Sequence, residues 1–159
     1  MSRATLVERM PLVTFALGDD HFAADVHAVE RVLRPVGISP VPGMPDWILG
    51  LLEYGGRSHP VIDLRRRLAL PARPADVEPR ILVVGGAEGG LAAVVDRVVD
   101  VSAVPVDTVD PAPPLFRGLS REYVGGVLRR DGRLVVLLHL ARLLSATERL
   151  AFEQVLADV

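Results

Sequence analysis

The sequence predicts an all-β protein in which one structural unit occurs twice, followed by a C-terminal helix. Three features of the 159 residues support this prediction. Valine-rich runs alternate with Gly-Gly and Asp-Gly turns, a segment of nineteen positions recurs later in the chain, and the clearest helix signature lies near the end. A chain of this length forms about one domain, or two small units that share a core.

Short apolar runs between turn residues predict β-hairpins. Gly55-Gly56 and Asp131-Gly132 accept positive φ angles in type I′ turns, and Gly85 to Gly90 has the composition of a hairpin tip. So many hairpins favour a barrel or a sandwich. We predict strands near residues 12–17, 21–26, 48–54, 57–62, 80–85, 91–95, 97–104, 123–130 and 133–138.

Two helical segments have sequence signals. Asp63 is a candidate N-cap for a short helical turn. Ser145 and Glu148 form a capping box, which begins a helix near residues 146–158. The apolar positions of this helix recur with a helical period and predict an amphipathic face packed on the barrels: Phe152, Val155, Leu156 and Val159.

The segment from Gly50 to Leu68 is repeated from Gly126 to Leu144, at an offset of 76 residues. Seven of the nineteen positions are identical, where this composition gives roughly one or two by chance. Earlier parts of the two units align at an offset of 69 residues, with Phe22-Ala23-Ala24 over Leu91-Ala92-Ala93. The repeat predicts two units of one fold, packed pseudo-symmetrically.

The composition excludes several kinds of chemistry. The chain contains no cysteine and no lysine, which rules out disulfides, thiolate metal sites, Schiff bases and a P-loop. The four histidines have no metal-ligand spacing. Ser58 and His59 are neighbours on a predicted strand, so their side chains point to opposite faces and cannot pair as nucleophile and base. We therefore predict no enzymatic activity and no metal, nucleotide or covalent cofactor.

The charge balance argues against a nucleic-acid partner. Twenty acidic and eighteen basic residues leave a net charge of −2. The run Arg65-Arg66-Arg67 has no interleaved aromatic residues that could stack bases, and we interpret it as a solvated or salt-bridged surface. Residues 1–10 lack the apolar core of a secretory signal, and no stretch approaches the length of a membrane span. We expect a cytoplasmic protein.

Several segments resemble the CheW family of chemotaxis coupling proteins. They include Leu12-Val-Thr-Phe-Ala-Leu, Val29-Glu-Arg-Val-Leu, Gly50-Leu-Leu and Pro60-Val-Ile-Asp-Leu, the last of which matches the family's habitual P-V-I-D-L. The resemblance runs from about Pro11 to the C-terminus. It implies a single CheW-like domain over residues 1–159, built from two intertwined five-stranded SH3-like β-barrels related by pseudo-two-fold symmetry. The first barrel is expected at roughly 12–75 and the second at roughly 80–144, with strands exchanged.

The resemblance also implies a function. CheW-like proteins are scaffolds without enzymatic activity. They couple the cytoplasmic tips of chemoreceptors (methyl-accepting chemotaxis proteins) to the regulatory domain of a CheA-type histidine kinase, and they lie with the receptors in cytoplasmic arrays. Other CheW-like domains are further partners, because a pseudo-symmetric domain offers two related faces for head-to-tail contacts.

Three positions in two segments depart from the family pattern where it implies partner contacts. After the glycine that matches Gly50 the family has V-I-N-L-R-G, so Glu53 replaces its asparagine and Gly55 its arginine. Arg31 occupies a position where the family has glutamate, and Glu30 is displaced by one residue. The loss of an arginine anchor and a reversed charge weaken an interface. The candidate partner-binding residues are Glu30, Arg31, Glu53, Tyr54, Gly55, Gly56 and Arg57.

Three functions follow as alternatives. The first is a coupling protein that tolerates these substitutions. The second is a divergent adaptor that binds receptors or other CheW-like domains without normal kinase coupling. The third is a small ligand-binding or hydrolytic β-barrel, which fold alone does not exclude.

Overall fold

The computed structural model describes residues 8–85, 90–112 and 119–157. Three predictions therefore lie outside the described residues: the absence of a leader sequence at residues 1–7, the centre of the glycine-rich tip at residues 86–89, and the packing of Val159. No helix in the described part of the chain has the length and apolar character needed to cross a membrane.

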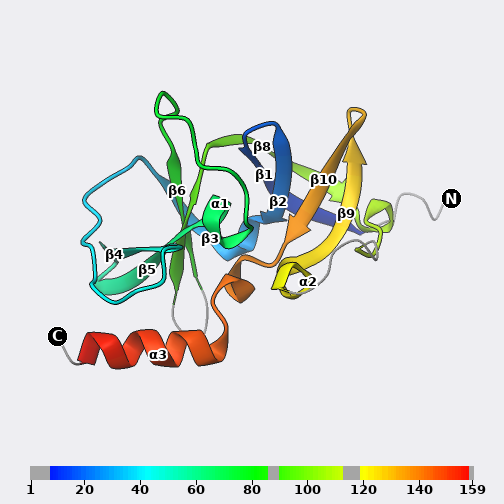
Figure 1. Ribbon diagram of the computed structural model, residues 1–159. Coiled ribbons are helices and arrows are strands. Elements are labelled where there is room, and N and C mark those ends of the chain that lie inside the picture. Colours follow the sequence, from blue (N-terminus) through cyan, green and yellow to red (C-terminus); the bar gives the residue numbers. More distant parts are fainter. Residues whose placement is uncertain (1–7, 86–89, 113–118, 158–159) are drawn as a thin grey trace, which may run out of the picture.

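The described residues form ten strands and three short α-helices (Figure 1). The strands are β1 Arg9–Leu17, β2 Asp20–Asp25, β3 Val29–Leu33, β4 Ile48–Tyr54, β5 Arg57–Asp63, β6 Arg80–Val84, β7 Leu91–Val95, β8 Arg97–Pro105, β9 Val124–Arg130 and β10 Arg133–Leu138. The helices are α1 Leu64–Arg67, α2 Leu119–Tyr123 and α3 Ala146–Ala157, with 3₁₀ turns η2 Val26–Ala28, η3 Val106–Thr108 and η4 Leu140–Leu143.

The strands form two five-stranded sheets that have the same internal order. Sheet A has the order β8-β1-β2-β10-β9, and sheet B has the order β3-β6-β7-β5-β4. If each strand of the first unit is exchanged for its counterpart in the second, the order of sheet A becomes that of sheet B. This arrangement confirms the predicted fold class, two intertwined SH3-like barrels related by pseudo-two-fold symmetry.

The two barrels are intertwined because each unit of the repeat contributes strands to both sheets. The β1–β2 hairpin of the first unit lies between β8 and β10 of the second, and the β6–β7 hairpin of the second lies between β3 and β5 of the first (Figure 1). Each sheet therefore has two pairings between the units. One is antiparallel, β1 with β8 in sheet A and β3 with β6 in sheet B, and the other is parallel, β2 with β10 and β5 with β7. Residues 12–75 and 80–144 are therefore units of the repeat that both extend across the two sheets.

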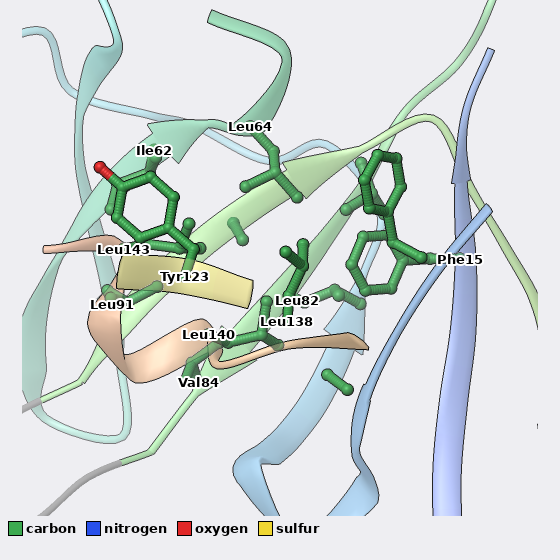
Figure 2. Close-up of a cluster of buried hydrophobic side chains, with 14 of the residues drawn as sticks. Phe15, Ile62, Leu64, Leu82, Val84, Leu91, Tyr123, Leu138, Leu140 and Leu143 are labelled. Carbon is green, nitrogen blue, oxygen red and sulfur yellow. The ribbon is translucent and has the colours of Figure 1, made fainter. Parts of the chain in front are cut away.

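The largest hydrophobic core lies where the two sheets meet. It contains Phe15 from sheet A, Leu82 and Leu91 from sheet B, and Tyr123 and Leu140 from the segments that flank β9 and β10 (Figure 2). Each sheet also encloses a smaller core, around Leu52 and Val83 in sheet B and around Leu12 and Leu128 in sheet A. All three cores combine residues from both units of the repeat, so neither unit can form a complete core without the other.

Most predicted elements occur close to their expected places, but strand β3 and helix α2 were not predicted. Strand β3 was not predicted, because it is an edge strand whose residues are mostly exposed and include Glu30 and Arg31, so it lacks the apolar alternation of a half-buried strand. Helix α3 begins with the predicted capping box: the Ser145 amide donates to Glu148 Oε1 at 2.9 Å, and the Glu148 amide donates to Ser145 Oγ at 3.1 Å. Of its predicted apolar face, Phe152 is buried and Val155 and Leu156 are half-buried.

Glycine is required at equivalent positions of β4 and β9. Gly50 has φ +147° and Gly126 has φ +151°. A Cβ atom at Gly50 would collide with the backbone oxygen of Ser39, and one at Gly126 would lie 2.6 Å from the backbone oxygen of Asp110. Those oxygens are fixed, because Ser39 and Asp110 each form a two-way bridge to the residue after the glycine.

We expect Gly50→Ala to lower the free energy of unfolding by about 2–4 kcal/mol, through an unfavourable φ angle and overpacking against backbone. Urea denaturation followed by circular dichroism measures the change. Gly37→Ala is the matched control, because Gly37 has open space around it and no positive φ angle. Equal unfolding midpoints for the two variants would contradict the prediction.

Candidate partner-binding site

The β4–β5 hairpin carries most of the candidate residues and projects from the end of sheet B. Gly55 and Gly56 form its turn with φ angles of +60° and +77°. The equivalent turn of the β9–β10 hairpin uses Asp131 and Gly132 at +53° and +74°, so the repeat conserves the turn geometry. Gly55 and Gly56 are exposed, and a Cβ atom on either would meet no atom within 4 Å. The hairpin therefore ends in a small uncharged tip.

The strands next to this tip hold its side chains in place. Across the hairpin, the Ser58 hydroxyl donates to Glu53 Oε1. Tyr54 is half-buried against the core of sheet B, and its ring meets the His59 ring edge-on at 6.1 Å between centroids. Glu53 and Arg57 are exposed. Thus Tyr54 anchors the hairpin, and Glu53 and Arg57 present opposite charges to solvent.

Glu30 and Arg31 lie on β3, at the opposite edge of sheet B. Both side chains are exposed, and the strand register shifts between Val29 and Arg31, so Glu30 has no partner residue on β6. The Glu30 carboxylate lies against Gly85, where a Cβ atom would collide with it. Strands β6, β7 and β5 separate β3 from β4 in the sheet order. The candidate residues therefore share one barrel but lie in two places, on the edge strand β3 and on the β4–β5 hairpin at the other side of the sheet.

Charge at these positions is available to a partner. Within the described residues, the ion pairs are formed by Arg65, Arg66, Arg67, Arg80 and Arg130, and none involves Arg31 or Arg57. Exposed arginines form bidentate contacts with carboxylates at protein interfaces. Arg31 thus gives positive charge to the edge strand β3, and Arg57 gives it to the tip of the β4–β5 hairpin.

The structure does not support catalytic chemistry at Ser58 and His59. The Ser58 hydroxyl bonds to Glu53, whereas His59 Nδ1 lies 3.3 Å from the backbone oxygen of Arg57. No three histidine or carboxylate side chains among the described residues are grouped closely enough to hold a metal ion. Ser58 and His59 are therefore not arranged as a nucleophile and its base.

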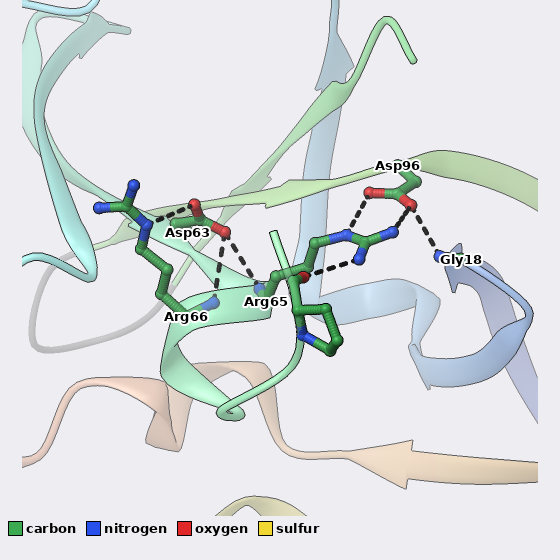
Figure 3. Close-up of polar contacts among 6 residues, drawn as sticks. Gly18, Asp63, Arg65, Arg66 and Asp96 are labelled. Atoms are coloured by element: carbon green, nitrogen blue, oxygen red, sulfur yellow. Dashed lines mark hydrogen bonds and ion pairs between the residues drawn. The ribbon is translucent and has the colours of Figure 1, made fainter. Parts of the chain in front are cut away.

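Sequence reasoning missed the role of the run Arg65-Arg66-Arg67. Arg66 is exposed and pairs with Asp63, but Arg65 is buried between the barrels (Figure 3). Arg65 Nε and Nη2 donate to the two oxygens of Asp96 at 3.0 and 2.5 Å, and the Gly18 amide donates to the same carboxylate at 2.7 Å. All three arginines form ion pairs, as the salt-bridged alternative expected, but the surface position is wrong for Arg65 and Arg67, which are buried. Helix α1 directs Arg65 inward towards Asp96, which follows β7.

The Arg65–Asp96 pair connects the two barrels. Arg65 follows β5 of sheet B, and Gly18 belongs to the β1–β2 turn of sheet A. Burial raises the pKa of Asp96, but the hydrogen bonds from Arg65 and Gly18 outweigh burial and hold that pKa below its usual value. The carboxylate is therefore charged at neutral pH and links both sheets to α1.

Arg67 connects α3 to the same junction. Its guanidinium lies 3.8 Å from the centre of the Trp47 ring and 5.2 Å from that of Tyr123, two residues that correspond at the offset of 76. It also donates to Glu148 of α3 at 2.6 Å and to the backbone oxygen of Leu143 at 3.0 Å. Burial raises the pKa of Glu148, but its hydrogen bonds with Ser145 and Arg67 keep it below the usual value.

Two intertwined SH3-like barrels with an exposed hairpin at one end define a double-barrel interaction domain. The family model for the CheW-like domain matches residues 11–148, and the chain belongs to this family. It is 28% identical to "Chemotaxis protein CheW" of Treponema pallidum, over 89% of this chain and 85% of that protein. It is 30% identical to "Probable chemotaxis protein CheW" of Rhizobium etli, over 86% of this chain and 88% of that protein.

A solved structure shares the fold. The crystal structure of scaffolding protein TtCheW from Thermoanaerobacter tengcongensis superposes with a TM-score of 0.80 at 25% sequence identity, covering 89% of this chain and 96% of that one. The double barrel is therefore present over nearly the full length of both chains.

Proposed function

We propose that this chain is a non-enzymatic scaffold of a bacterial chemosensory array, which binds the cytoplasmic tip of a chemoreceptor and the regulatory domain of a CheA-type histidine kinase. The family match over residues 11–148 carries this proposal. The names of the relatives support it, since they are chemotaxis proteins and one solved neighbour is a scaffolding protein. The contact residues we assign are Glu30, Arg31, Glu53, Tyr54, Gly55, Gly56 and Arg57.

A second candidate function is an adaptor that binds receptors or other CheW-like domains and couples the kinase weakly. The tip of the β4–β5 hairpin favours it. Gly55 stands where the family has an arginine, and within the described residues no atom lies within 4 Å of where its Cβ would be. Loss of a central arginine anchor costs about 2 kcal/mol or more, which corresponds to roughly 30-fold in affinity. Arg31 adds a charge reversal on the other edge of the barrel.

Restoring the family residues tests both functions. We expect the double variant Arg31→Glu, Gly55→Arg to bind a kinase regulatory domain or a receptor tip about tenfold more tightly than the unmodified chain, as measured by isothermal titration calorimetry. The φ angle of +60° at Gly55 imposes about 1–2 kcal/mol of strain on an arginine there, so unfolding must be measured beside affinity. The side chain itself fits, because the space around Gly55 is open.

Gly55→Asn is the matched control, because asparagine tolerates positive φ and brings no charge. It should leave affinity unchanged. If the double variant folds but binds neither partner more tightly, Arg31 and Gly55 are not the reason why this chain differs from the family in partner binding. The unmodified chain is also compared with a relative that has the arginine. If both bind the two partners equally tightly, the proposal of an ordinary coupling protein is supported and the adaptor proposal is wrong.

A further inference from the structure

Each sheet has one edge that is bridged by a neighbouring segment and one edge that is open. At the bridged edges, Ser39 pairs with Leu51 of β4, and Asp110 pairs with Val127 of β9. At the other edges, β3 pairs with β6 alone and β8 with β1 alone, within the described residues. An open edge presents backbone N–H and C=O groups with which another strand can pair.

The two open edges differ in how well charge protects them. Strand β3 has five residues and carries two exposed charges, Glu30 and Arg31, which oppose pairing with another strand. Strand β8 has nine residues, and its central Val101 is 62% exposed. The charge next to Val101 is Asp100, which accepts two hydrogen bonds from Arg130 at 2.9 and 3.0 Å. A second strand can therefore approach β8 without leaving that carboxylate unpaired.

The backbone groups of two β8 residues point out of sheet A. The Val106 amide donates to the Glu8 oxygen at 2.9 Å, at the end of the β1–β8 pairing. Hydrogen-bonded and non-bonded pairs alternate along an antiparallel ladder, so every second residue counted back from Val106 directs its groups at β1. Val101 and Ala103 lie between those residues and face outward. Within the described residues, the exposed Arg9 guanidinium approaches these groups, 3.4 Å from the Ala103 oxygen.

Ser102, between the two outward-facing residues, has a buried hydroxyl without a hydrogen-bond partner among the described residues. A two-fold axis beside Ser102 would place Val101 opposite Ala103 of a second copy, and the reverse, which gives four backbone hydrogen bonds. The two Ser102 side chains would then be neighbours, and rotation about Cα–Cβ lets their hydroxyls bond to each other. An axis beside Asp100 would instead oppose two carboxylates. The strand is therefore self-complementary at Ser102.

We propose that β8 pairs antiparallel with β8 of a second copy of this chain, across a two-fold axis beside Ser102. The two A sheets then join into one sheet of ten strands. The same surface is used by both copies, so the dimer is closed and leaves no further β8 edge open. Burial of Val101 adds hydrophobic stabilisation to the backbone hydrogen bonds. The candidate partner-binding residues lie on sheet B, so this dimer is independent of the proposed function.

Sedimentation velocity of the full chain, between about 10 μM and 1 mM, should show a monomer that converts to a dimer. Val101→Arg should weaken dimerisation at least about tenfold, because it places two like charges close to the axis. Val32→Arg is the matched control. Val32 is the equivalent of Val101 at the offset of 69 residues, is 43% exposed and lies on β3. It should leave the dimer unchanged, and circular dichroism checks that both variants are folded.

A single cysteine tests the axis directly, because the chain contains no cysteine. Ser102→Cys changes one atom and should give a disulfide-linked dimer on oxidation, since residues opposite each other in a non-bonded pair have Cα atoms about 4.5 Å apart. Val32→Cys, treated alike, should stay monomeric. A chain that is monomeric throughout, a dimer that Val101→Arg does not weaken, or a Val32→Cys disulfide that forms as fast as that of Ser102→Cys would each overturn the proposal.

Discussion

A fragment that ends at residue 75 is expected not to fold cooperatively by itself. It keeps the β1–β2 and β4–β5 hairpins but loses every strand that joins them. Strand β3 pairs only with β6, and β5 reaches the rest of its sheet only through β7. Isolated hairpins are marginally stable in water. The fragment would also expose its share of all three cores.

Circular dichroism during urea titration tests this expectation, with the full chain as the reference. The full chain should unfold in one sigmoidal transition, and residues 1–75 should show none. Mixing residues 1–75 with residues 76–159 should restore the transition, because the two fragments together supply every strand of both sheets. A monomeric 1–75 fragment with its own sigmoidal transition would contradict the intertwined topology.

Removing the buried carboxylate between the barrels is expected to destabilise the protein strongly. Asp96→Ala leaves the buried Arg65 guanidinium without its counterion and the Gly18 amide without an acceptor. Breaking a buried ion pair in this way costs about 3–5 kcal/mol. The free energy of unfolding from urea titration measures the loss. The double variant Arg65→Met, Asp96→Ala should recover much of it, because no buried charge remains unpaired.

Asp100→Ala is the matched control for this prediction. Asp100 pairs with Arg130 at 2.9 Å, but both side chains are partly exposed, at 44% and 27%. Solvent screens such a pair, so its loss should cost about 1 kcal/mol or less. If Asp96→Ala is no more costly than Asp100→Ala, the Arg65–Asp96 pair does not hold the barrels together.

The same pair predicts how acid affects the protein. The pKa of Asp96 is lower in the folded chain than in the unfolded chain, where it is about 3.9. The ionised Asp96 carboxylate therefore contributes its full stabilisation above about pH 3.9. This contribution is lost as the pH falls through the pKa that Asp96 has in the folded chain. The difference in stability between the unmodified chain and Asp96→Asn should narrow in that acidic range.

The candidate site shows the limits of sequence reasoning at single residues. The turn at Gly55-Gly56 was predictable, because two glycines between strands specify positive φ angles. The burial of Arg65 and Arg67 was not predictable, because a run of three arginines reads the same in the sequence whether its side chains are exposed or lie between two barrels. Only the position of Asp96 and of Trp47 in space distinguishes the two cases.

The sequence alone determined the hairpins, their turns, the repeat and the capping box of α3, because each is specified by residues that are neighbours along the chain. The tertiary structure decided which hairpins pair. The parallel contacts of β2 with β10 and β5 with β7 join distant residues such as Phe22 and Val136. Such pairings depend on the core that both units share, so they cannot be predicted from a local sequence pattern. The same reason explains why β3 was missed: an exposed edge strand is held by its neighbour β6 and has little burial of its own to mark it.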